Sequence, residues 1–101
     1  MKLYHVGPEN LTNIESLYNQ MGEDAYEVFE ERWPEAAELG IYHAHYIHLW
    51  DVLEDARDFA DEIGGTVYEV EADGLDVEID ELEYPHPIIR DEIPAEYVMA
   101  I

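Results

Sequence analysis

The chain has 101 residues, enough for one domain, and its 48% hydrophobic content is ordinary for a protein with a buried core. Because 26 Asp and Glu residues face only 4 Lys and Arg residues, the formal net charge is −22, which excludes a basic patch for direct binding of nucleic acid or of an anionic membrane. The absence of cysteine excludes disulfides, thiolate metal sites and a cysteine nucleophile.

The first part of the chain predicts a short strand followed by helices. Residues 2–6 are rich in apolar side chains and end at a Gly-Pro pair, which is typical of a strand and a turn. Apolar residues recur at helical spacing over residues 11–21, where Thr12 begins a capping-box pattern. A second helical pattern over residues 26–39 is interrupted at Pro34.

Residues 41–49 alternate β-branched and aromatic residues and predict a strand. Alternation places His43 and His45 on one face of this strand and His48 on the other. The His-x-His spacing permits two imidazoles to hold one metal ion, with no third ligand indicated. We expect these histidines to hydrogen bond with carboxylates and expect no metal, and a metal held by His43 and His45 is the alternative.

The second half of the chain predicts one amphipathic helix and several strands. Asp51 has the sequence pattern of an N-cap, residues 52–63 carry an apolar face, and Gly64 ends the helix. Strands are expected over residues 66–71, 76–80, 88–90 and 97–101. The expected fold class is α+β, a small single domain over residues 1–101 with N-terminal helices and a mixed or mainly antiparallel sheet.

The strand at residues 76–80 carries three acids on one side, Asp76, Glu78 and Asp80. Carboxylates in such a row are ligands for a hard cation, but the loop glycine and the bidentate glutamate of a calcium site are missing. We expect instead a solvated edge, because charges on an edge strand prevent pairing with other sheets.

Four short segments lie in an order that is familiar from one superfamily. They are Leu3-Tyr4-His5, His48-Leu49-Trp50-Asp51, Val67-Tyr68-Glu69-Val70-Glu71-Ala72 and Ile93-Pro94-Ala95-Glu96-Tyr97. In these segments the chain resembles the ADP-ribosyltransferase-like superfamily, and most closely its RNA 2′-phosphotransferase branch. That branch has a strand ending in a Val-His-Leu-Ser-like motif, a helix rich in Glu and Ala, and a strand similar to Val-Leu-Glu-Val-Asp-Ala.

The resemblance implies an ADP-ribosyltransferase-like fold with a cleft for NAD or a nucleotide ribose, between the first strand and the strand at residues 41–49. His5 matches the histidine that contacts the nicotinamide-side ribose, His48 matches the second-strand position, and Arg90 lies near the third motif position. These three are therefore the expected cofactor-binding residues. No glutamate matches the catalytic acid of the transferase branches, so the catalytic residues remain unassigned and catalysis stays open.

The acidity has two explanations, which lead to different functions. Carboxylates occur in every segment, which favours adaptation to concentrated salt, as in a halophilic source. Alternatively, the chain is a non-catalytic acidic interaction protein, such as a viral component or a DNA-mimic inhibitor that binds a basic protein. The N-terminal residues lack a signal-peptide pattern and no apolar stretch could span a bilayer, so we expect a soluble cytoplasmic protein.

Overall fold

Antiparallel strand pairing organises the fold, which a computed structural model describes for residues 1–32, 34, 44–81 and 85–101. In chain order the elements are β1 (Lys2–Gly7), β2 (Ile14–Glu15), α1 (Leu17–Met21), α2 (Asp24–Arg32), β3 (Tyr46–His48), α4 (Leu53–Ile63), β4 (Thr66–Glu71), β5 (Val77–Asp80), β6 (His86–Arg90), β7 (Glu92–Ile93), the 3₁₀ helix η2 (Ala95–Tyr97) and β8 (Val98–Ala100). Within the described residues the strands form sheets in the orders β1-β4-β8, β2-β7 and β3-β6-β5. The expected small α+β domain is confirmed, with antiparallel sheets and a radius of gyration of 12.9 Å.

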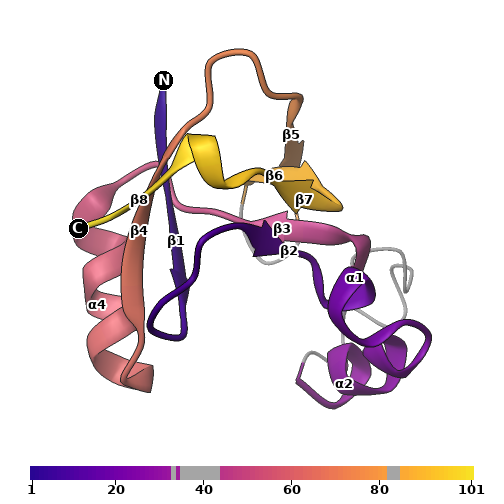
Figure 1. Ribbon diagram of the computed structural model, residues 1–101. Helices are drawn as coiled ribbons and strands as arrows, with labels where there is room; N and C mark the ends of the chain where they lie inside the picture. The colour runs from indigo at the N-terminus through magenta and orange to yellow at the C-terminus, as the bar shows by residue number, and fades with distance from the viewer. Residues whose placement is uncertain (33, 35–43, 82–84) are drawn as a thin grey trace.

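Strands β1 and β4 of the sheet β1-β4-β8 present apolar side chains to both faces because such residues occur at alternate and at intervening positions along them. Val6 and Val67 point to one face, where they pack with Ala56 and Ala60 of α4. The small alanine side chains let the helix approach the sheet closely, and Figure 1 shows α4 lying along β1 and β4. The strand that the sequence predicted over residues 66–71 is therefore confirmed.

The opposite face of this sheet forms the main core together with the sheet β3-β6-β5. The buried members of this core are Leu3, Ile14, Ile47, Leu49, Tyr68, Val70, Ala72, Ile89 and Ile93. Burying each large aliphatic side chain stabilises the fold by about 1.5–3 kcal/mol. Tyr68 has the largest of the fully buried side chains. Its hydroxyl donates to the carbonyl of Pro8 and accepts from the N–H of Leu11. The core thus fixes the loop that follows β1.

One pair of hydrogen bonds joins the segment after β3 to β1. The N–H of Tyr4 donates to the carbonyl of Trp50, and the N–H of Trp50 donates to the carbonyl of Tyr4, both at 2.8 Å. The Trp50 ring then packs on Phe59 of α4, with ring centroids 4.9 Å apart. This bridge ties the two three-stranded sheets and the helix into one unit.

The prediction of a helix over residues 11–21 is wrong for the first half of this segment. Ile14 and Glu15 instead pair with Glu92 and Ile93 as β2 and β7, and Ile14 is buried in the main core. Ser16 then caps α1, because its hydroxyl accepts from the N–H of Asn19. The apolar spacing was real, but pairing with a strand distant in sequence overrides helix propensity there.

Other boundaries also differ from the expected ones. The expected strand at residues 41–49 is a strand only at Tyr46–His48, after a 3₁₀ turn at residues 44–45, and residues 41–43 lie outside the described part. Val52 rather than Asp51 occupies the N-cap of α4 and makes no side-chain cap bond. The last strand begins only after η2. The continuation expected over residues 36–39 also falls outside the described residues.

The remaining elements agree with expectation. Strands occur at the expected first strand, at 66–71 and across 88–90, and α2 covers the first part of the second helical pattern. Gly64 has the left-handed conformation that the end of α4 requires, with φ of 74°. Among the described residues no helix is long and apolar enough to cross a membrane.

A methyl group at Gly65 is expected to destabilise the contact between α4 and the sheet. A Cβ there would lie 2.7 Å from Cγ1 of Val6, which packs with Ala56 and Ala60 of α4. Gly65→Ala should therefore cost about 1–3 kcal/mol and lower the melting temperature by at least ~5 °C. Thermal unfolding followed by circular dichroism measures this, with Glu62→Ala on the exposed surface of α4 as control. A melting temperature unchanged in Gly65→Ala would contradict this packing.

Candidate functional site

His5 lies at the junction that the Tyr4–Trp50 bridge creates. It stands opposite Tyr68 in the β1–β4 pairing and shares the face of β1 that Leu3 presents to the main core. Its ring abuts Gly7, where a Cβ would be only 3.1 Å from Nε2. The Nδ1 atom is buried and has no hydrogen-bond partner. Buried polar atoms usually have a hydrogen-bond partner, so this nitrogen has hydrogen-bonding capacity that the described residues do not use.

Burial keeps the His5 imidazole neutral. Loss of solvation lowers its pKa from 6.5 to about 4, and a hydrogen bond with the backbone of His48 acts weakly in the opposite direction. That interaction also shows that the two histidines of the sequence prediction are neighbours. The contact, however, runs from the His5 ring to the main chain of His48 and not to its imidazole.

The His48 imidazole belongs to a different cluster, on the other face of β3. Its Nδ1 lies 2.8 Å from Nε2 of His86, in a hydrogen bond whose donor depends on the tautomers. The two rings are 5.1 Å apart and inclined by 37°. One ligand atom of Asp80 completes a group in which all three atoms lie within 4.8 Å of one another.

The register of the sheet β3-β6-β5 explains why these three residues meet. His48 stands opposite Ile88 of β6, and His86, two residues earlier, shares the face of Ile88. Asp80 of β5 stands directly opposite His86. The three side chains thus come from three adjacent strands at one end of the sheet, with Ile47 and Ile89 facing the main core on the other side.

Asp80 corrects the expectation of a fully solvated acidic edge. Its exposed fraction is 8%, and no other carboxylate of the described residues is buried to this degree. Glu78 on the same strand is exposed. Ile79 is instead 64% exposed. The two acids share one face of β5, and they differ in that Asp80 stands opposite His86 whereas Glu78 stands opposite Ile88.

Sequence reasoning did not single out His86 or Asp80 as partners of His48. Their spacing along the chain carries no metal-ligand motif, and only the cross-strand register brings them together. The available signal was a histidine at the start of one strand and an acid at the end of the preceding one, which is the pattern of facing positions in a hairpin.

The structure places the other predicted site residues apart from both histidine centres. Arg90 is exposed, lies 5.9 Å from the centroid of the Tyr46 ring and pairs with Asp91 at 3.7 Å. His45 accepts or donates a 2.9 Å hydrogen bond with the hydroxyl of Tyr26 and stacks on Tyr18. His43 is outside the described residues, so a metal held by His43 and His45 stays a prediction, as does a cofactor contact by Arg90.

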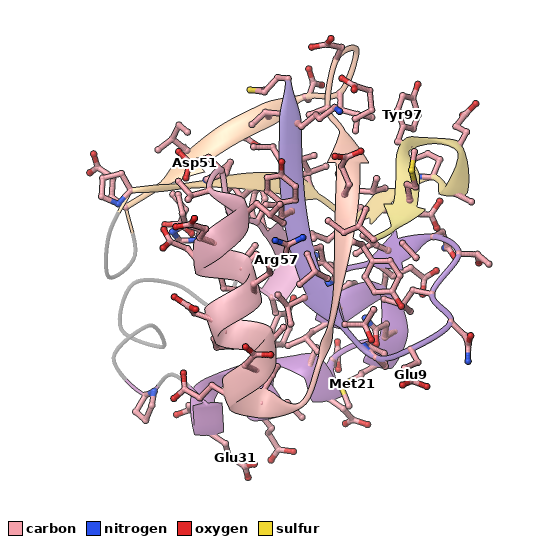
Figure 2. All side chains as sticks on the ribbon, turned by 90° about the vertical axis from the view of Figure 1, so that its left-hand side faces the viewer. Glu9, Met21, Glu31, Asp51, Arg57 and Tyr97 are labelled. Atoms are coloured by element: carbon pink, nitrogen blue, oxygen red, sulfur yellow. The ribbon has the colours of Figure 1, made fainter. Side chains whose placement is uncertain are left out.

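A hollow of about 380 Å³ opens beside α4, away from both histidine centres. Its lining includes Arg57, Asp61, Thr66 and Ile101. Figure 2 shows Arg57 reaching from α4 across the neighbouring strands, while Asp51 lies at the beginning of the helix. The hollow combines one cation with one acid, so it offers no strongly charged site for a phosphate.

Comparison with known proteins identifies no relative. No family model matches the chain, and no curated protein and no solved structure is similar to it. The candidate site therefore has to be argued from its own residues.

The low pKa of His5 makes stability depend on pH in a defined direction. The unfolded chain binds a proton at His5 near pH 6.5, whereas the folded chain binds it only near pH 4. The contribution of the neutral His5 ring to the free energy of unfolding is therefore complete above pH 6.5 and is lost as the pH falls toward 4. The loss should reach about 3 kcal/mol in acid.

Urea unfolding at a series of pH values measures this loss, with His5→Gln as comparison because it removes only this titration. The free energy of unfolding of the wild type should fall more steeply below pH 6.5 than that of the variant. Parallel curves would show that His5 is not desolvated.

Proposed function

We propose that the chain binds a nucleotide ribose, of the NAD type, where β1 meets the segment that follows β3. One observation carries this proposal. The reciprocal hydrogen bonds of Tyr4 and Trp50 pair the two segments whose residues resemble the first and second strands of the ADP-ribosyltransferase-like superfamily. These segments are far apart in the sequence, and their proximity supports the cleft that the resemblance implied between the first strand and the strand at residues 41–49.

His5 would make the central contact with the ligand. Its neutral ring can donate from one nitrogen and accept at the other, and the unused Nδ1 gives it capacity for a ribose hydroxyl. The main chain at His48 adjoins this ring. The His48 imidazole and Arg90 lie on the outer face of β3 and β6, so the proposal does not depend on their side chains.

The proposal concerns binding and assigns no catalytic step. Affinity for a dinucleotide would have to overcome the repulsion between its phosphates and a chain of net charge −22. Screening in concentrated salt shortens this repulsion to a few ångströms, so binding should be measured in high-salt buffer. An ADP-ribosyltransferase-like fold is part of the same hypothesis.

A thermal-shift titration with NAD tests the nucleotide site. Free ligand at 100 times its dissociation constant stabilises the folded state by about 2.7 kcal/mol, which raises the melting temperature of a domain of this size by several degrees. His5→Ala should abolish the shift. His45→Ala serves as control, because His45 packs in a separate cluster with Tyr18 and Tyr26.

Two results would refute the nucleotide site. One is the absence of a shift at millimolar NAD and millimolar ADP-ribose in the folded wild type. The other is a shift that is equal in the wild type and in His5→Ala. Circular dichroism of each variant establishes that it is folded before the titration.

We propose further that the acidity is an adaptation to concentrated salt. The described ion pairs of Arg90 and of the N-terminus join exposed groups, and that of Lys2 joins an exposed ammonium to the half-buried Glu69 at 3.6 Å, so these pairs contribute little. Carboxylates project from most of the exposed positions of α4, namely Glu54, Asp55, Asp58, Asp61 and Glu62. Their mutual repulsion destabilises the folded state in dilute buffer.

The melting temperature should therefore rise by at least several degrees as KCl increases from dilute to molar concentration, because salt screens this repulsion. Scanning calorimetry measures it. Asp58→Lys with Asp61→Lys, which lower the local repulsion on α4, should reduce the salt dependence.

The contrary result is equal stability at low and high salt. It would favour the acidic interaction protein, whose association with a basic partner should weaken steeply with salt.

A further inference from the structure

We infer that His48, Asp80 and His86 form a binding site for one divalent transition-metal ion. The three ligand atoms lie within 4.8 Å of one another, and Nδ1 of His48 is 2.8 Å from Nε2 of His86. Each residue comes from a different strand of one sheet, so the backbone hydrogen bonds of β3, β5 and β6 hold the ligands in place. The site does not rest on the nucleotide proposal.

The distances fit a metal with small side-chain adjustments. Ions such as Zn²⁺ bind imidazole nitrogen and carboxylate oxygen at about 2.0–2.2 Å, which puts neighbouring ligand atoms of a tetrahedron about 3.3–3.6 Å apart. The His48 and His86 nitrogens, 2.8 Å apart, would have to separate by about half an ångström to hold one ion between them. The proposal includes a rotation about the side-chain χ angles that brings in the Asp80 oxygen.

The donor set selects the kind of ion. Two imidazoles with one carboxylate suit zinc, iron, nickel and copper, whereas magnesium and calcium prefer oxygen ligands. Three protein ligands leave at least one coordination position open, which is the arrangement of reactive rather than purely structural sites. The site would therefore hold the ion with a position for water or a small anion.

Burial of Asp80 is the independent observation that favours a ligand here. Among the described carboxylates Asp80 is the one that is buried, whereas the others are exposed or, at Glu15 and Glu69, half-buried, and burying a carboxylate is costly unless a positive group lies beside it. A metal ion beside Asp80 supplies two positive charges. A proton shared by the two imidazoles would supply one, and it is the competing account of the same contacts.

A proton and a metal ion differ in measurable ways. Imidazole nitrogens bind metal only when they are unprotonated, so a proton and a metal ion compete for the same nitrogens. The many surface carboxylates also attract divalent cations, so each titration should contain excess Mg²⁺. Magnesium occupies diffuse oxygen sites and leaves a nitrogen-containing site to zinc.

Isothermal titration calorimetry with Zn²⁺ in excess Mg²⁺ is the first test. We expect one Zn²⁺ per chain, and affinity at least ~10-fold lower in both Asp80→Asn and His86→Gln. Asp61→Asn removes the same charge from exposed α4, and His45→Gln removes a histidine outside the cluster. Both controls should bind zinc as the wild type does, and so should His5→Ala.

If a variant fails to fold, binding of Co²⁺ to the unmodified chain, followed by visible absorption and NMR spectroscopy, tests the same site without a substitution. Co²⁺ bound by two imidazoles and one carboxylate gives visible d–d absorption, and the ring resonances of His48 and His86 should be selectively broadened. No saturable zinc binding in excess Mg²⁺, or equal affinity in the wild type and in folded His86→Gln, would overturn the site. Broadening of other histidines instead would also overturn it.

Discussion

The pair of hydrogen bonds between Tyr4 and Trp50 is the contact on which the arrangement of this domain depends. It brings the segment leaving β3 to the edge of β1, so the two three-stranded sheets share one core. The same contact brings the His5 ring to the main chain of His48. Figure 1 shows the consequence, with α4 beside β1 and β4 and with the segment that follows β3 running across to them.

The two histidine centres differ because they lie on opposite faces of the strands that this bridge connects. His5 faces the apolar core, where lost solvation lowers its pKa and keeps it neutral. The His48 ring points away from that core, to His86 and the buried Asp80. A neutral hydrogen-bonding ring suits a ribose, and a nitrogen-and-carboxylate cluster suits a metal ion, so the two proposals assign different chemistry to different faces.

Local patterns in the sequence predicted the elements better than their partners. The amphipathic spacing before Gly64 identifies α4, and alternation identifies β4, because these signals reside within one segment. Ile14 pairs with Ile93 and leaves the expected helix because that choice depends on a distant segment. Asp80 and His86 escape prediction for the same reason, since cross-strand register is a property of the folded chain.

The direct test of the Tyr4–Trp50 bridge is solution NMR of the isotopically labelled chain in high-salt buffer. We expect a nuclear Overhauser effect between the two amide protons, because residues that exchange both hydrogen bonds across antiparallel strands face each other. Both amides should also exchange with solvent as slowly as the amides of paired β1 and β4. Rapid exchange at both amides and no cross-strand effect would contradict the arrangement that places His5 beside His48.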